Sequence, residues 1–163
     1  MTARLVLLFL ALSSLVGCDH ATKHWAESSL GRGGVTVMPG VFELRYAQNH
    51  DVAFNLLRDL PSPYKLLVVT TLAALATLAM VAFWWQRRKE APLSEQVGFV
   101  LVLGGALGNL IDRMARGYVV DFLHLTHWPI FNVADILLCV GLGLLLVGSW
   151  RRRGSPPAHE APA

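Results

Sequence analysis

Four apolar stretches constrain the fold of this chain more than any other feature of its sequence. They cover residues 5–17, 66–85, 97–111 and 130–150. A helix needs about 20 residues to cross the hydrocarbon core of a bilayer, and the second and fourth stretches meet that length directly. The first and third reach it only by including polar residues at one end, which places ionisable groups at membrane depth. Because 54% of the residues are hydrophobic and 15% charged, the chain is a polytopic membrane protein rather than a soluble domain.

Basic residues predict the orientation of these spans. Arg4 precedes the first stretch, Arg87, Arg88 and Lys89 follow the second, and three arginines at 151–153 follow the fourth. With four spans all of these charges fall on one side of the membrane, and short loops rich in Lys and Arg are cytoplasmic. We therefore expect both termini in the cytoplasm and residues 25–65 and 116–128 outside it. The net charge of +3 reports this topology, so no nucleic-acid partner is expected.

The predicted fold is mainly α-helical, with one membrane domain over residues 1–153. Its spans should lie at about 4–25, 66–85, 97–113 and 130–150. Between the first two spans, glycines and a proline punctuate runs of period-two alternation at 35–37 and 41–46, which predicts a small β-rich cap outside the membrane over about 26–64. A short interfacial helix is predicted at 53–57, and the Pro- and Ala-rich tail at 154–163 should be disordered.

The first span has a competing interpretation. Arg4, the apolar run after it and Leu15-Val16-Gly17-Cys18 look like a cleavable secretory signal ending in a lipobox. Three further spans argue against this, and Asp19 and Lys23 continue the helix with the i, i+4 spacing of an ion pair. We interpret them as a structural pair at the outer end of a retained span, the alternative being a flexible segment. The two cysteines, Cys18 and Cys139, are expected to be buried thiols without a disulfide.

Residues 104–135 concentrate the candidate chemistry. This segment leaves one apolar stretch, passes through a short polar loop and enters the next, with carboxylates at Asp112, Asp121 and Asp135. An acid at the mouth of a span must be paired, protonated or turned toward water, so it is a functional-site candidate. Asp121 and Asp135 come from separate segments and could meet at the outer interface, where they would share one proton. One would activate water as a general base and the other would protonate a scissile carbonyl, as in aspartic proteases.

The neighbours of these acids are small or amide-bearing residues. Gly104 and Gly108 have the spacing that lets another helix approach closely. Asn109 lies at membrane depth, where an unsatisfied amide is costly and a partner is expected. Asn132 is three residues before Asp135, so the two face the same way and Asn132 can cap the fourth helix.

Five sequence blocks stand along the chain in this order: 19–23 (DHATK), 49–54 (NHDVAF), 104–113 (GGALGNLIDR), 119–122 (VVDF) and 131–135 (FNVAD). Together they resemble bacterial lipoprotein signal peptidase, the signal peptidase II family. The resemblance implies an inner-membrane aspartic endopeptidase that cuts diacylglyceryl-modified prolipoproteins just before the lipidated cysteine. It implies no cofactor and no metal, and partners limited to the lipid-modified prolipoprotein substrate and membrane phospholipid, with the enzyme a monomer.

Site residues follow from the same resemblance. The family's catalytic aspartates fall on Asp121 and Asp135. Its supporting polar residues fall on Asp19, Lys23, Asn49, Asn109, Arg113 and Asn132. Arg113 would hold a carboxylate or substrate carbonyls, while Asp112 would support structure. One position departs from the family, which usually has Gly where this chain has Asp51. A Gly there suggests positive φ, which Asp tolerates, so the turn should survive with an added charge.

Two other interpretations remain open at this point. Asp121, His124 and His127 are three residues apart and would share one side of a helix, as a metal site requires. Pro129 and the absence of an HExxH motif weaken that interpretation. The chain could also be a non-enzymatic four-helix membrane protein, such as a small transporter subunit or an assembly factor, that keeps buried Asp and Asn residues for packing or proton transfer.

Overall fold

The computed structural model describes residues 2–31, 33–51, 61 and 64–153. Its elements are α1 (Thr2–Ser29), β1 (Val35–Met38), β2 (Phe42–Asn49), α2 (Tyr64–Arg87), α3 (Leu93–Arg116), β3 (Val119–Leu125) and α4 (Val133–Arg153). Within the described residues, four helices are long and apolar enough to cross a membrane. The prediction of a mainly helical, multi-pass membrane protein with a small β-rich cap is therefore confirmed.

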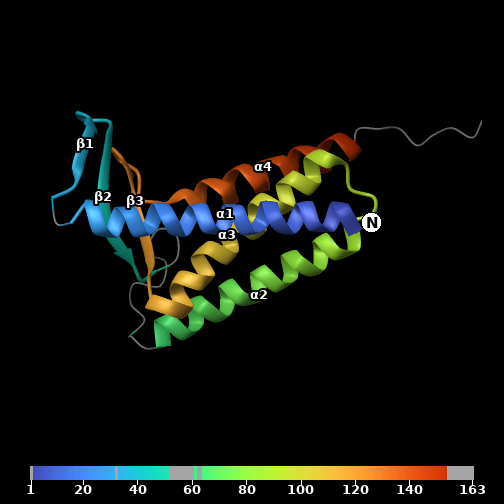
Figure 1. The fold of residues 1–163 in the computed structure, drawn as a ribbon, viewed down its shortest axis with the longest axis horizontal. Coiled ribbons are helices and arrows are strands. Elements are labelled where there is room, and N and C mark those ends of the chain that lie inside the picture. Colours follow the sequence, from blue (N-terminus) through green and yellow to red (C-terminus); the bar gives the residue numbers. More distant parts are fainter. Residues whose placement is uncertain (1, 32, 52–60, 62–63, 154–163) are drawn as a thin grey trace, which may run out of the picture.

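The helices lie side by side along the long axis of the molecule, and the sheet sits at one end (Figure 1). The N-terminus, the turn between α2 and α3 and the end of α4 all lie at the opposite end. The cationic groups of Arg87, Arg88, Arg151 and Arg152 therefore share one end of the molecule, as the charge pattern predicted. Most large apolar side chains of the helices point outward, which suits surroundings of lipid.

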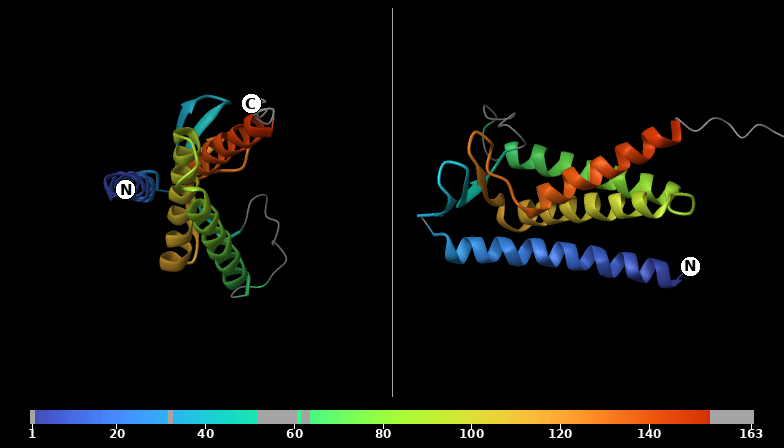
Figure 2. Two further views of the ribbon diagram at one scale, coloured as in Figure 1. Left: turned by 90° about the vertical axis from the view of Figure 1, so that its right-hand side faces the viewer. Right: turned by 90° about the horizontal axis from the view of Figure 1, so that it is seen from above.

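Glycines set how closely α3 approaches its neighbours. A Cβ on Gly104 would meet Leu15 of α1 at 3.2 Å, and one on Gly108 would meet Oδ2 of Asp19 at 2.5 Å. Gly105 faces α4, where an added Cβ would collide with the backbone oxygen of Ala134. The expected close packing at Gly104 and Gly108 is thus confirmed, and its partner is α1. Figure 2 shows α1 set beside the other three helices.

The sheet has the order β1-β2-β3 with antiparallel neighbours. Sequence reasoning anticipated β1 and β2, but it placed residues 116–128 in a loop and missed β3, which holds Asp121. An isolated bridge between Leu123 and Phe131 then brings the start of α4 against β3. Ala26, Leu30 and Phe122 form a small apolar cluster that fastens the sheet to the end of α1.

The structure differs from the sequence-based expectations for the two cysteines and for Asp51. Cys18 and Cys139 are free thiols, but both are exposed on outward helix faces rather than buried. Asp51 has no positive φ, since His127 is the single non-glycine residue of the described chain with that conformation. The interfacial helix expected at 53–57 and the tail at 154–163 lie outside the described residues.

Candidate active site

The start of α4 positions the first candidate carboxylate. Asn132 accepts a hydrogen bond from the backbone N–H of Asp135 at 3.1 Å, and Asp135 Oδ2 accepts one from the backbone N–H of Asn132, also at 3.1 Å. This reciprocal pair is a capping box that satisfies orphan donors at the helix start. The predicted cap is therefore confirmed, and it fixes the side chain of Asp135 at the mouth of α4.

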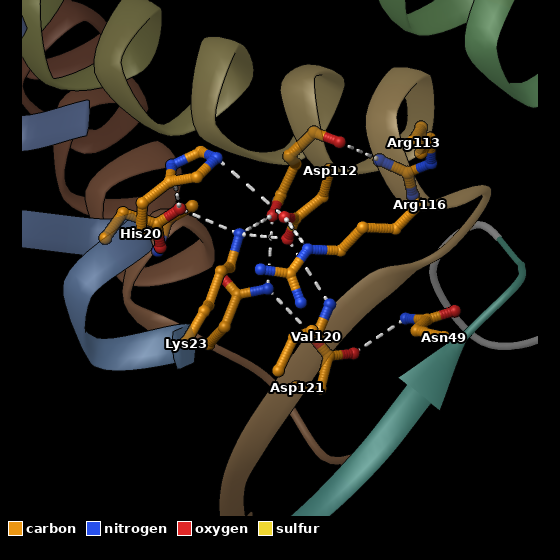
Figure 3. Close-up of polar contacts among 12 residues, drawn as sticks. His20, Lys23, Asn49, Asp112, Arg113, Arg116, Val120 and Asp121 are labelled. Carbon is orange, nitrogen blue, oxygen red and sulfur yellow. Dashed lines mark hydrogen bonds and ion pairs between the residues drawn. The ribbon is translucent and has the colours of Figure 1, made fainter. Parts of the chain in front are cut away.

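The second candidate carboxylate, Asp121, comes from β3 and is held by two amides. Asn132 donates from Nδ2 to Asp121 Oδ1 at 2.6 Å, and Asn49 at the end of β2 donates from Nδ2 to Oδ2 at 2.8 Å (Figure 3). Asn132 thus contacts both carboxyl groups, Asp121 through its side chain and Asp135 through its backbone. Asn132 therefore bridges the two acids, and among the residues that the structure describes Asp121 and Asp135 form no hydrogen bond with each other.

Asn109 links Asp135 to a buried cation. Its Nδ2 donates to Asp135 Oδ1 at 2.8 Å, and its Oδ1 accepts from Lys23 Nζ at 2.9 Å and from Asn132 Nδ2 at 3.1 Å. Because an ammonium group can only donate, Lys23 determines which end of the Asn109 amide faces it. The donor end of Asn109 is left to face Asp135.

Lys23 lies between two further buried acids. Its Nζ is 2.7 Å from Asp19 Oδ2 and 2.9 Å from Asp112 Oδ2, and the lysine side chain is fully buried. The predicted Asp19 and Lys23 pair is therefore confirmed, with Asp112 as an additional partner. Arg116 Nε approaches Asp112 Oδ1 at 3.4 Å (Figure 3), and its Nη1 pairs with Glu27 of α1 at 2.5 Å, so Arg116 is shared between two acids.

Each of these two supporting acids also holds the backbone next to a candidate catalytic acid. Asp19 Oδ1 accepts from the N–H of Ala134, the residue before Asp135, at 3.0 Å. Asp112 Oδ2 accepts from the N–H of Val120, the residue before Asp121, at 3.3 Å. The ion cluster on α1 and α3 consequently sets the positions of both β3 and α4.

Arg113 lies beside this centre and binds backbone oxygens. Its Nη2 donates to the carbonyl of Asp51 at 3.2 Å and its Nη1 to the carbonyl of Asn109 at 3.4 Å. Both carbonyls belong to this chain, so the expected contact of Arg113 with substrate carbonyls stays a prediction. Asp51 also donates its N–H to Asn49 Oδ1 at 2.9 Å and accepts from Lys65 Nζ at 2.9 Å. Sequence reasoning did not anticipate that Asp51 orients Asn49.

Burial and charge perturb Asp121. Its side chain is 2% exposed. Burial, and then the nearby Asp135, raise the pKa of the Asp121 carboxyl from 3.8 to about 6, against the lowering effect of the hydrogen bonds from Asn49 and Asn132. A carboxyl of this kind takes up and releases a proton near neutral pH, as acid–base catalysis requires.

The rival metal site is not formed as the spacing suggested. Asp121 and His124 lie on β3 rather than on a helix, and His127 follows the strand in a turn. Asp121 faces Asn49 and Asn132, whereas His124 lies next to Glu43 of β2. No group of three His, Cys, Asp or Glu side chains in the described ranges is arranged to hold a metal ion.

Comparison with known proteins gives a consistent result. The family model described as signal peptidase (SPase) II matches residues 11–151. A lipoprotein signal peptidase of Syntrophotalea carbinolica is 39% identical over 91% of this chain and 94% of the relative, and one of Pseudoalteromonas translucida is 36% identical over 96% and 95%. A bacterial membrane enzyme solved by the in meso method at 2.3 Å resolution superposes with a TM-score of 0.78 at 25% identity, covering 95% of this chain and 94% of that one.

Proposed function

The chain belongs to the signal peptidase II family, and from this membership we propose that it cleaves diacylglyceryl-modified prolipoproteins just before the lipidated cysteine, with Asp121 and Asp135 as its catalytic pair. The family makes it a membrane protease, and the aspartic type fits that family. The observation that carries the assignment of residues is the bridge at Asn132, which contacts two acids from separate elements, β3 and α4.

The chemistry follows from two carboxyl groups that hold one proton between them. The ionised carboxylate accepts a proton from a water molecule as that water attacks the carbonyl carbon of the scissile peptide bond. The protonated partner donates its proton to the carbonyl oxygen, giving a neutral tetrahedral diol. Breakdown returns a proton to the leaving amide nitrogen and restores the carboxyl pair. The raised pKa of Asp121, about 6, supports its holding the proton before attack, although such a pair titrates as a unit.

The remaining polar residues act as positioning groups in this scheme. Asn49, Asn109 and Asn132 each donate an amide hydrogen to one of the two acids. Asp19 and Lys23 act one contact further away, through the backbone of Ala134 and through Asn109. Arg113 is placed to donate to peptide carbonyls, of which it already holds two. Groups held in this way need no rearrangement when charge develops in the transition state.

The position of the two acids in the molecule also supports a prolipoprotein substrate. The acids lie where the helices meet the sheet, at the end of the molecule opposite Arg87, Arg88, Arg151 and Arg152. If the arginine-rich end is cytoplasmic, as short basic loops are, the acids face the periplasmic surface of the inner membrane. The signal peptide of a prolipoprotein spans that membrane and brings the cleavage site to the same surface. The diacylglyceryl group on the cysteine after that site lies in the bilayer. We expect the enzyme to act as a monomer.

The test uses one prolipoprotein in two forms, with and without the diacylglyceryl group on its cysteine. We expect the purified protein to cut only the lipidated form, and mass spectrometry should place the new N-terminus at the modified cysteine. A chelator should leave the rate unchanged, since the scheme uses no metal. Equal cleavage of both forms, or cleavage at another bond, would overturn the substrate assignment.

A further inference from the structure

A second polar site lies at the arginine-rich end, away from the acids. A cavity of about 460 Å³ lies between α2, α3 and α4 there and is open on one side. Its lining is mostly apolar and includes Met80, Phe83 and the buried Phe99. Arg87 and Arg152 line it at the last turns of α2 and α4. A volume of this size is in the range of small-molecule sites, and an apolar body with a few polar groups is their usual lining.

Charge at the cavity is only partly balanced. Glu95 on α3 is 2% exposed and forms an ion pair with Arg152. Gly148 makes room for this pair, because a Cβ there would meet the Glu95 side chain at 2.9 Å. Arg87 has no such acid, and within the described residues its Nε is buried without a hydrogen-bond partner. One positive charge and one open donor therefore remain, and a buried donor of this kind calls for an acceptor.

We propose that this cavity binds a phospholipid with an anionic headgroup, whose phosphate accepts hydrogen bonds from Arg87 while an acyl chain lies along Phe83 and Phe99. Guanidinium groups pair well with phosphate oxygens. A free phosphate would leave the apolar lining empty. Leu146 lines the cavity and is 70% exposed on the outer face of α4, so the cavity opens sideways to the surrounding lipid.

The surrounding charges favour an anionic headgroup over a zwitterionic one. Arg88 and Lys89 lie at the same end, where Glu95 is already paired with Arg152 and Glu90 is exposed. Basic side chains at the membrane surface attract anionic lipid. The site is independent of cleavage, since the candidate catalytic acids lie at the other end of the helices.

Native mass spectrometry of the full-length protein in detergent tests the proposal, with phosphatidylglycerol, phosphatidylcholine and inorganic phosphate as probes. Wild type should retain phosphatidylglycerol more tightly than phosphatidylcholine. Arg87→Gln should lower its affinity for phosphatidylglycerol about tenfold, as expected for one charge-assisted hydrogen bond. Lys89→Gln is the matched control, since it removes one charge from the same end without lining the cavity.

A second variant acts in the opposite direction. Glu95→Gln releases Arg152, so phosphatidylglycerol should bind several-fold more tightly than to wild type. Equal retention of both lipids, or equal effects of Arg87→Gln and Lys89→Gln, would overturn the site. Displacement of phosphatidylglycerol by millimolar inorganic phosphate would show a site for phosphate alone and would also overturn it.

Discussion

Replacing Lys23 with Met tests the buried ion cluster that supports the candidate active site. Lys23 is fully buried between Asp19 at 2.7 Å and Asp112 at 2.9 Å. Arg116 pairs with both Asp112 and Glu27. Lys23 is therefore the basic side chain that compensates Asp19. Methionine has a similar length but no charge, so Lys23→Met leaves one buried negative charge without compensation. Breaking a buried ion pair from one side costs about 3–5 kcal/mol, and we expect unfolding to be easier by that amount.

The measurement is the free energy of unfolding in phospholipid micelles titrated with sodium dodecyl sulfate, followed by tryptophan fluorescence. The triple variant Asp19→Asn, Lys23→Met, Asp112→Asn is the control, because replacing a whole ion cluster by neutral groups is often close to neutral in stability. It should recover most of the loss, although not the cleavage, since Lys23 also orients Asn109. A loss below about 1 kcal/mol in Lys23→Met, the size of a surface pair, would refute the reasoning.

Three further outcomes follow from the contacts of the two acids. Burial and Asp135 raise the pKa of Asp121 from 3.8 to about 6, so the protonated carboxyl stabilises the fold below about pH 4 and this contribution is lost as the pH rises through about 6. Over that window the free energy of unfolding of wild type should fall by about 3 kcal/mol relative to that of Asp121→Asn. Parallel profiles of unfolding free energy against pH would contradict the assignment. Asn132→Ser should keep the cap of α4 but remove the buried donor to Asp121, so the free energy of unfolding should fall by about 1–3 kcal/mol while cleavage falls about 100-fold. Asn132→Ala should also lose the cap, which lowers the free energy of unfolding by about 1 kcal/mol more. Asp51→Gly removes the tie to Lys65 and loosens the backbone that orients Asn49, so kcat should fall several-fold with KM little changed, whereas a change in KM alone would indicate a role in substrate binding.

The elements of this fold differ in how well local sequence determines them. Long apolar stretches predict α2 and α4 because only a helix satisfies its backbone within lipid. Strand β3 was missed because Val119–Leu125 is a short run beside polar loop residues, and its pairing with β2 is a long-range contact that local pattern does not contain. Cys18 and Cys139 were expected inside because thiols are usually buried in water-soluble proteins, whereas lipid lets them face outward.

The acids of the candidate site were predictable from the sequence, but the contacts that hold them in place were not. Buried acids at span ends point to a site by their cost alone, and the family blocks select Asp121 and Asp135 among them. Asp112 was expected to support structure, and it does so by holding Val120 and sharing Lys23. That Asp19 and Asp112 each hold the residue before a candidate catalytic acid depends on how α1, α3, β3 and α4 pack together. The same holds for the tie from Asp51 to Asn49, because no spacing rule places those groups.

Cleavage by the two single-acid variants tests the central assignment most directly. Purified Asp121→Asn and Asp135→Asn proteins would each be incubated with a lipidated prolipoprotein, beside wild type and the lipid-site variant Arg87→Gln as a control for insertion and handling. Each acid is needed in one protonation state that Asn cannot supply, so both variants should fold and show no cleavage above background while Arg87→Gln cuts at the wild-type rate. Appreciable cleavage by either variant would contradict the assignment of Asp121 and Asp135 as the catalytic pair.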